Sequence, residues 1–303
     1  MRLFEPETTA GPSQAADAVA EAAPSGPLRR VMLLVAYDGT GFRGFAAQPG
    51  DIPTVGGRLA GALERVAGAP VSLTCAGRTD AGVHAAGQVV HFDVPAGAPG
   101  AARLEMAGRR LADSLSHQCG PEVAVLDARQ APSGFDARHS ALARSYRYLL
   151  LRSASPDPLL RDRAWHVPAE LDLAAMRIAA DCLLGEHDFS AFCRRPPGQP
   201  GSPGGSLVRR VTRLSVTAAV AGDDRLWAID IEANAFCHQM VRSVTGALVS
   251  VGEGRATAAS VLENLRSRDR SHGTRLAPPG GLCLMAVNYP EALVPGVVWK
   301  APR

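Results

Sequence analysis

The sequence predicts an α+β fold built from two similar units, and three observations lead to this prediction. The chain has 303 residues, enough for two domains, and its 46% hydrophobic and 20% charged residues are typical of a globular protein. Apolar residues alternate over short segments and recur at helical spacing over longer ones. The order β-α-β-β-α-β occurs twice, which predicts two ferredoxin-like or RRM-like units with antiparallel sheets side by side. A cleft between them is the natural place for a catalytic site.

Composition divides the chain into four parts. Residues 1–28 are rich in Ala, Pro, Ser and Glu, which predicts a disordered N-terminal extension. Residues 29–141 form the predicted N-terminal α+β domain, 142–292 the C-terminal one, and 293–303 a tail. Within the second domain, the Pro- and Gly-rich segment 195–206 predicts an exposed, mobile loop.

The first unit begins with an apolar strand followed by an amphipathic helix. Thr54 is a candidate N-cap, because its side-chain oxygen can accept a hydrogen bond from the first helical turn, and the apolar residues that follow it lie on one stripe. The predicted elements are a strand over Val31–Tyr37, a helix from Thr54 with Val55, Leu59, Leu63 and Val66 on its stripe, strands over Val71–Ala76 and Gln88–Val94, a helix over Arg103–Leu115 and a strand over Val123–Ala128.

The second unit repeats this order of elements, although the two halves share no residue-level repeat. Gly185 ends the first predicted helix, as glycine commonly does. The predicted elements are a strand over Ser145–Leu151, a helix over Asp172–Leu184, strands over Val208–Thr217 and Leu226–Ala233, helices over His238–Val251 and Thr257–Arg266, and a strand over Leu282–Tyr289.

Charge and hydropathy bear on whether the protein binds a polyanion, crosses a membrane or is exported. The net charge of +3 is too small to indicate a polyanionic partner by itself. Arginines gather at 138–147, 194–213 and 266–275; taken alone these runs favour three solvated faces, and the alternative is that they line one groove. Apolar runs such as Val31–Ala36 are far shorter than the roughly 20 residues that cross a bilayer. The N-terminal residues lack the apolar core of a signal peptide, so we expect a cytoplasmic protein.

The cysteines predict neither a zinc ribbon nor a redox motif. They are scattered without a C-x-x-C pair, so we expect six reduced, mostly buried thiols: Cys75, Cys119, Cys182, Cys193, Cys237 and Cys283. A metal site formed by Cys75, His84 and His91 is disfavoured, because three ligands on both faces of a hairpin lack a closed fourth. We therefore expect no metal.

The segment Gly77–His84 is the strongest candidate for chemistry. It places Arg78 and Asp80 two residues apart in a flexible loop between two apolar strands. Such a loop can direct a carboxylate into a cleft, and a nearby cation keeps it ionised for work as a nucleophile or base. The alternative has about equal weight from the residues alone, because Asp and Gly also form ordinary turns.

Separate blocks of the sequence, in the same order, resemble those of the tRNA pseudouridine synthase A family. The longest block runs over Cys75–His84 and continues through Gly87–Phe92. The others are Tyr37–Thr40 with Phe42 and Gly44, Phe135 with Ala137–Arg138 and Arg144–Tyr148, Gly185–Phe189 with Phe192, Asn234–Phe236 with His238 and Met240–Arg242 up to Gly246, and Gly281–Leu282 through Val287–Tyr289. The resemblance extends over nearly the whole of residues 29–290.

This resemblance implies isomerisation of uridine to pseudouridine at positions 38–40 of the tRNA anticodon stem-loop, by a homodimer that uses neither cofactor nor metal. It assigns the essential carboxylate to Asp80 and the cation that pairs with it to Arg242. Tyr146 would stack on the target base and take part in proton transfer, and Arg78 would help to extract the uridine. Arg144, in the same motif as Tyr146, is a further expected substrate-binding residue.

Alternatives remain at individual residues and for the whole protein. Tyr146 is alternatively a core aromatic, since Tyr148 shares its strand face, and Arg242 is alternatively a helix-surface arginine. A non-catalytic RNA-binding protein is the competing function, but the aromatic strand motifs expected of it are absent. The chain departs from the usual family pattern at Gly44–Ala46 and at Gly56–Gly57, which affects packing and substrate range more than chemistry.

Overall fold

The computed structural model describes residues 28–101, 108–132, 134–194, 206–272 and 275–294. The predicted N-terminal extension before Leu28, most of the 195–206 loop and most of the tail fall outside the described residues. No helix in the described ranges is long and apolar enough to cross a membrane.

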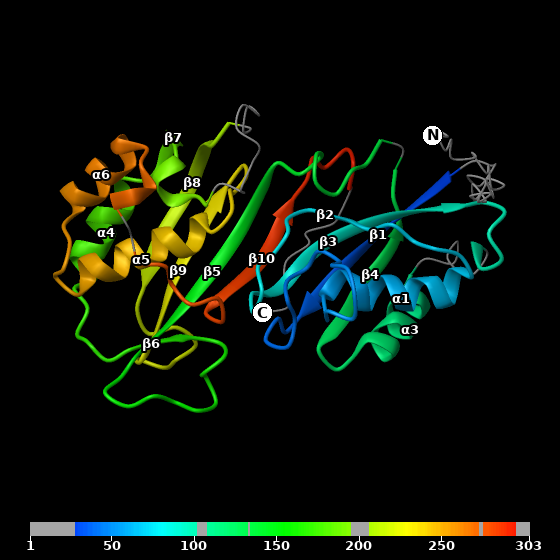
Figure 1. The fold of residues 1–303 in the computed structure, drawn as a ribbon, viewed down its shortest axis with the longest axis horizontal. Coiled ribbons are helices and arrows are strands. Elements are labelled where there is room, and N and C mark those ends of the chain that lie inside the picture. The colour runs from blue at the N-terminus through cyan, green and yellow to red at the C-terminus, as the bar shows by residue number, and fades with distance from the viewer. Residues whose placement is uncertain (1–27, 102–107, 133, 195–205, 273–274, 295–303) are drawn as a thin grey trace, which may run out of the picture.

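A single mixed β-sheet runs through the whole structure, in the strand order β4-β1-β3-β10-β5-β9-β8-β7 (Figure 1). The first half contributes β1 (Leu28–Tyr37), β2 (Thr74–Cys75), β3 (His84–Pro95) and β4 (Val123–Gln130), with helices α1 (Val55–Ala67) and α3 (Arg109–Cys119). The second half contributes β5 (Ala143–Arg152), β6 (Trp165–Val167), β7 (Gly185–Asp188), β8 (Val208–Thr217), β9 (Leu226–Ala233) and β10 (Leu282–Asn288), with helices α4 (Leu173–Asp181), α5 (Met240–Gly252) and α6 (Ala258–Ser267). The predicted α+β class is confirmed.

The helices gather in two groups toward the two ends of this sheet (Figure 1). Helices α1 and α3 lie together in the first half, and α4, α5 and α6 lie together in the second. The predicted N-cap Thr54 accepts a hydrogen bond from the Gly57 amide at 3.1 Å, and α1 buries Leu59 and Leu63 completely. The stripe that sequence periodicity predicted is therefore the face that packs.

The two halves meet where β3 and β10 pair in parallel. His84 lies opposite Cys283, and Ala85 lies opposite Leu284. Close approach of the two strands depends on Gly87, because a Cβ there would lie 2.3 Å from the Met285 carbonyl oxygen. The expected pair of sheets side by side is thus joined edge to edge into one.

The His84 side chain forms hydrogen bonds to both halves of the chain at this junction. Its Nδ1 accepts a hydrogen bond from the Gly39 amide at 3.0 Å, and its Nε2 lies 2.7 Å from the Asp162 carbonyl and 3.0 Å from that of Gly280. Two carbonyl neighbours require a proton on Nε2, so the ring donates to the second half and accepts from the first.

Several predicted boundaries need correction. Strand β2 is only Thr74–Cys75 rather than Val71–Ala76, and β3 begins at His84 rather than Gln88. The open edge of β3 explains both differences, since it pairs with β2 near His91 and then with β10 near His84. Of the helix predicted over Arg103–Leu115, residues 103–107 lie outside the described residues; helix α3 spans Arg109–Cys119 and so extends past the predicted end, because Leu115 and Cys119 are both buried.

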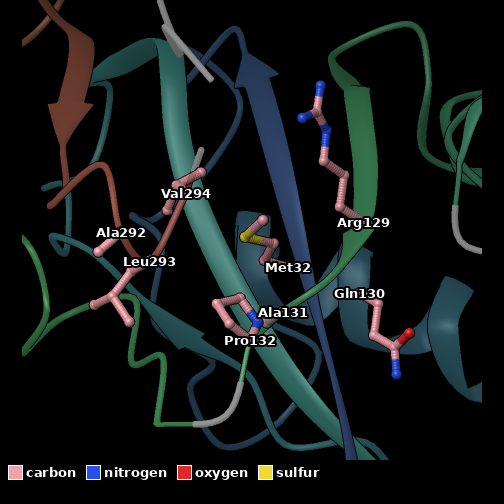
Figure 2. A pocket seen from close by; sticks show the side chains of 8 residues that line it. All are labelled: Met32, Arg129, Gln130, Ala131, Pro132, Ala292, Leu293 and Val294. Atoms are coloured by element: carbon pink, nitrogen blue, oxygen red, sulfur yellow. The ribbon is translucent and has the colours of Figure 1, made fainter. Parts of the chain in front are cut away.

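A cavity of about 460 Å³ lies between β1, the end of β4 and the segment that follows β10 (Figure 2). It is lined by residues of β1, β4 and the segment after β10: Met32, Arg129, Gln130, Ala131, Pro132, Ala292, Leu293 and Val294. None of the predicted site residues is among them.

Candidate active site

The loop between β2 and β3 carries Asp80 and is held from both sides. The Thr79 hydroxyl lies 2.8 Å from that of Tyr37, and Gln88 donates from Nε2 to the Gly77 carbonyl at 2.7 Å. Tyr37, Thr79 and Gln88 are all buried, whereas Asp80 is partly exposed. The predicted flexible loop is therefore anchored by its buried members and presents a carboxylate.

Residues 44 and 45 also contact this loop. The Phe45 amide donates to the Thr79 carbonyl at 3.1 Å, and a Cβ at Gly44 would lie 2.9 Å from the same oxygen. The Phe45 carbonyl in turn accepts from the Gly56 amide at 2.8 Å, and a Cβ at Gly56 would lie 2.6 Å from it. The two departures from the family pattern thus touch each other, and Phe45 is a packing residue with 3% exposure.

The Asp80 carboxylate lies between two potential cations from the second half. Arg242 on α5 places Nη1 at 3.2 Å from Oδ2, and His238 places Nε2 at 3.4 Å from Oδ1. The Arg242 side chain is 12% exposed, that of Asp80 29% and that of His238 42%. The predicted pairing of Asp80 with Arg242 is present, and it joins residues from opposite halves of the chain.

Arg242 is fixed by the segment that precedes β10. Its Nε donates to the Ala277 carbonyl at 2.8 Å, and the Ala277 amide donates back to the Arg242 carbonyl at 3.2 Å. One helical turn later, Gly246 allows this segment to touch the helix backbone, because a Cβ there would lie 1.5 Å from the Arg275 carbonyl oxygen. The alternative of a solvated helix-surface arginine is excluded.

The Tyr146 side chain on β5 lies beside Gly77, the first residue of the Asp80 loop. It is 8% exposed, packs edge to face on Phe236 with ring centroids 5.0 Å apart, and its hydroxyl would be 3.5 Å from a Cβ on Gly77. Burial raises the pKa of its phenol, and the Arg144 charge opposes this only in part, so the phenol is neutral at physiological pH. Tyr148 is fully buried and donates to the Pro278 carbonyl at 2.7 Å.

The two remaining predicted substrate-binding arginines differ in exposure and in their hydrogen-bond partners. Arg78 is exposed, two residues before Asp80, and has no hydrogen-bond or ion-pair partner among the residues that the structure describes. Arg144 is 8% exposed, and its guanidinium donates to backbone carbonyls of Ala76, Arg138, Ala141 and Asn234. Only Arg78 therefore presents its charge to solvent at this site.

The histidines and cysteines of the first half do not assemble a metal site. His91 is buried and accepts a hydrogen bond on Nδ1 from the Ala137 amide at 2.9 Å, and His84 bridges the two halves as described above. Within the described ranges no three His, Cys, Asp or Glu side chains come together as metal ligands. Cys75 is a buried thiol whose pKa is raised to about 11 by burial.

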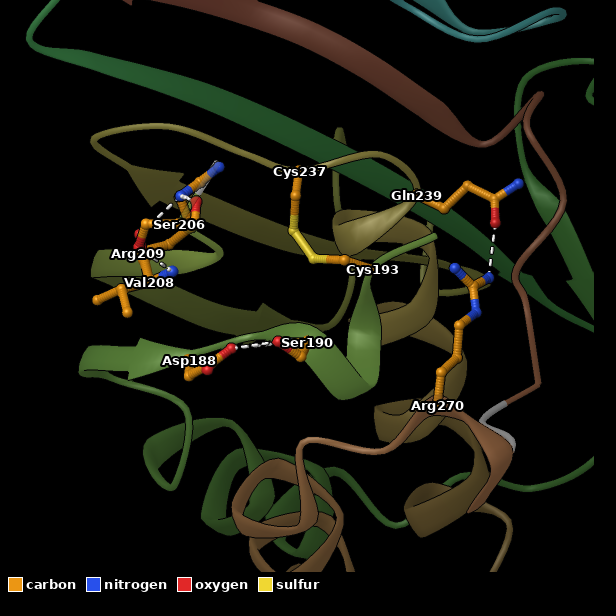
Figure 3. Close-up of a disulfide and its surroundings, with 9 residues drawn as sticks. All are labelled: Asp188, Ser190, Cys193, Ser206, Val208, Arg209, Cys237, Gln239 and Arg270. Atoms are coloured by element: carbon orange, nitrogen blue, oxygen red, sulfur yellow. Dashed lines mark hydrogen bonds between the residues drawn. A yellow bond between two sulfur atoms is a disulfide. The ribbon is translucent and has the colours of Figure 1, made fainter. Parts of the chain in front are cut away.

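The expectation of six reduced thiols is wrong for one pair. Cys193 and Cys237 form a disulfide with their Cα atoms 5.7 Å apart, while the other four cysteines are free (Figure 3). Spacing along the chain could not reveal this bond, since 44 residues separate its ends. It ties the residue before Arg194 to the residue before His238, and the Arg194 amide donates to the His238 carbonyl at 2.9 Å.

His238 is the site residue that reasoning from the sequence did not single out. The signal was its position in the same motif as Arg242, between the end of β9 and the start of α5. Gln239 follows it with a φ of 66°, a left-handed conformation that turns the chain into α5. The Gln239 side chain accepts a hydrogen bond from Arg270 at 2.6 Å (Figure 3).

The fold and this site define a class of protein: an α+β enzyme that presents one loop carboxylate, ion-paired to an arginine from the other half of the chain. Comparison with known proteins identifies the family. A family model described as tRNA pseudouridine synthase matches residues 179–290. A tRNA pseudouridine synthase A of Methylobacterium nodulans is 45% identical over 264 residues, which cover 87% of this chain and 97% of that protein.

Similar relatives occur in other bacteria. The tRNA pseudouridine synthase A of Frankia casuarinae is 44% identical over 87% of this chain and 90% of its own length. That of Neisseria gonorrhoeae is 41% identical, over 87% of this chain and 93% of its own. The chain therefore belongs to the tRNA pseudouridine synthase A family, and the resemblance found in its sequence blocks is confirmed.

Proposed function

We propose that this protein isomerises uridine to pseudouridine at positions 38–40 of the tRNA anticodon stem-loop, with Asp80 as the essential carboxylate and without a cofactor. The observation that carries the proposal is the 3.2 Å contact between Asp80 and Arg242, which joins the two motifs expected to supply the catalytic pair. Membership of the tRNA pseudouridine synthase A family supplies the reaction class.

The chemistry requires one reactive carboxylate in a restricted site. The bond between the ribose and N1 of uracil must break, and the freed base must turn and rejoin the ribose through carbon 5. A carboxylate serves this sequence by attacking the ribose or by accepting a proton while the base is held. Arg242 forms an ion pair with Asp80 and orients it, because the guanidinium is itself fixed on the Ala277 carbonyl.

Recognition of the uridine falls to the residues around Asp80. A stacked base is unreachable until it leaves the helix, so the exposed Arg78 inserts where the base was or holds the backbone that releases it. Tyr146 lies beside the Asp80 loop and offers an aromatic ring and a neutral hydroxyl to the extracted base. Its burial against Phe236 supports a fixed platform rather than a mobile one.

We further propose two ferredoxin-like units, with the substrate cleft at their junction. The strand orders β4-β1-β3-β2 and β10-β5-β9-β8 support this, because in each half the fourth strand lies beside the first and the third beside the second. Position of the Asp80–Arg242 pair across the two halves supports a cleft there. A homodimer in the cytoplasm is the expected working form, and sedimentation of the purified protein with and without tRNA tests its assembly.

The experiment uses unmodified tRNA transcripts that carry a single uridine at position 38, 39 or 40. Each is incubated with the protein in buffer containing a chelator, and pseudouridine is mapped by its selective chemical labelling. We expect product at these positions with the wild-type protein and none with Asp80→Ala, while tRNA binding persists in both. Binding without product from the wild-type protein would instead support an RNA-binding protein without catalysis.

A further inference from the structure

Arg144 occupies an unusual place for a charged side chain. It lies on β5, opposite Ala233 of β9 and Val287 of β10, in the middle of the continuous sheet. It is 8% exposed, and no carboxylate among the described residues forms an ion pair with it. Burying a guanidinium without a counter-charge is costly, so its environment must compensate in another way.

Backbone carbonyls provide that compensation. Nε and Nη2 donate to Ala76 at 3.3 and 3.0 Å, and Nη2 also donates to Arg138 at 2.6 Å. Nη1 donates to Ala141 at 3.3 Å and to Asn234 at 2.8 Å. A guanidinium has five N–H groups, and these five hydrogen bonds occupy all of them.

The carbonyls belong to three segments that meet at the site. Ala76 is four residues before Asp80 and immediately precedes the loop that presents the carboxylate. Asn234 is four residues before His238, whose ring lies beside the other oxygen of Asp80. Arg138 and Ala141 belong to the connection between β4 and β5, that is, between the two halves of the chain.

Tyr146 completes the arrangement on the same strand. It follows Arg144 by two residues, so both side chains leave β5 on the same face, and the Tyr146 hydroxyl lies against Gly77. Arg144 and Tyr146 thus meet two successive residues of the Asp80 loop, Ala76 and Gly77. A rigid strand sets the distance between the carboxylate and the aromatic platform.

We propose that Arg144 is a positioning residue for the isomerisation: its guanidinium holds the Asp80 loop, the His238 segment and the connection between the halves in one register, and it does not bind RNA. This inference rests on the proposed function and replaces the sequence-based expectation that Arg144 contacts the substrate. A phosphate contact would need a free, exposed donor, which Arg78 has and Arg144 lacks. Carbonyl acceptors from three segments instead match the planar fork of arginine, which lysine cannot reproduce.

The test compares Arg144→Ala, Arg144→Lys and Arg78→Ala under single-turnover and steady-state conditions on the transcripts described above. For Arg144→Ala we expect kcat to fall about 100-fold with KM for tRNA changed less than about threefold, since the loop loses its register but the RNA surface is intact. Guanidinium ion added to the buffer should restore at least about tenfold of that loss by filling the vacated space, and it should not restore Arg78→Ala.

Arg144→Lys keeps the charge and the fold even if the alanine variant does not fold. We expect its kcat to fall about tenfold, with an unchanged slope of tRNA binding against salt concentration, because no phosphate contact is lost. A wild-type kcat in Arg144→Lys would overturn the inference. So would a raised KM at unchanged kcat with a salt slope smaller by about one, which is the pattern of a lost phosphate contact. Absence of product from the wild-type protein would count against the proposed function itself, and the two failures are therefore distinguishable.

Discussion

Replacement of Arg242 by Met tests whether the ion pair at Asp80 sustains activity. The two charged atoms are 3.2 Å apart, with side chains 12% and 29% exposed. At this separation the attraction is about 5 kcal/mol for an effective dielectric constant near 20 and about 1 kcal/mol in bulk water. Partial burial places the pair between these limits, and we take about 3 kcal/mol, which corresponds to a loss of about 100-fold in kcat.

The assay follows release of hydrogen from carbon 5 of uridine, because the new ribose bond displaces it. Tritium at that carbon in a tRNA transcript makes the release countable. Arg242→Lys is the matched control: it keeps the charge but cannot bind the Ala277 carbonyl and Asp80 with one planar group, so we expect a smaller loss of about tenfold. The reasoning is refuted if Arg242→Met retains more than about a third of wild-type kcat while the protein stays folded.

Three further predictions concern stability and covalent structure. Gly246→Ala should lower the free energy of unfolding by about 3 kcal/mol, whereas Gly61→Ala, with only the Arg65 side chain nearby at 3.6 Å, should be neutral or stabilising; chemical denaturation decides. Burial, reinforced by Arg30, lowers the pKa of His91, so the native state stays neutral where the unfolded state binds a proton, and stability should fall as pH drops below about 6.5. His91→Gln should flatten that pH dependence, and an unchanged slope would contradict it. Thiol labelling of denatured, unreduced protein should modify four cysteines and, after reduction, six; six before reduction would exclude the Cys193–Cys237 disulfide.

Local elements were predictable because local rules decide them. Strands β8 and β9 have the bounds that alternation predicted, helix α1 starts after its predicted N-cap Thr54, and α4 and α6 start one residue after the predicted first residues, Asp172 and Thr257. The side chains of Thr54, Asp172 and Thr257 each accept from an amide in the first turn of their helix. These features depend on residues within a few positions of one another, which is the range over which sequence patterns are informative.

Pairing between distant segments was not predictable in the same way. The parallel contact between β3 and β10 joins residues about 200 positions apart, and no turn or spacing indicates it. Strands β6 and β7 were missed, since β6 has three residues and β7 is a short polar segment without alternation. Both are specified by the neighbouring strands β5 and β8 rather than by their own residues.

In the candidate site too, local motifs were predictable and contacts between distant segments were not. Asp80, Arg242 and Tyr146 came from motifs, and the structure brings the first two into contact and sets the third beside the loop. The placement of Arg144 depends on carbonyls 68 and 90 residues away, which its sequence neighbours do not reveal; the motif indicates a substrate contact, whereas we propose a positioning role from its hydrogen bonds. An arginine in a motif does not reveal whether it faces RNA or backbone.

The most direct test of the central claim is single-turnover pseudouridine formation by Asp80→Asn. Asparagine keeps the shape of the side chain and its place beside Arg242 but has neither the charge nor the nucleophilic oxygen. We expect the variant to bind tRNA as the wild-type protein does and to form no measurable pseudouridine. Product from Asp80→Asn at a rate within about tenfold of the wild type would contradict the assignment of the reaction to this carboxylate.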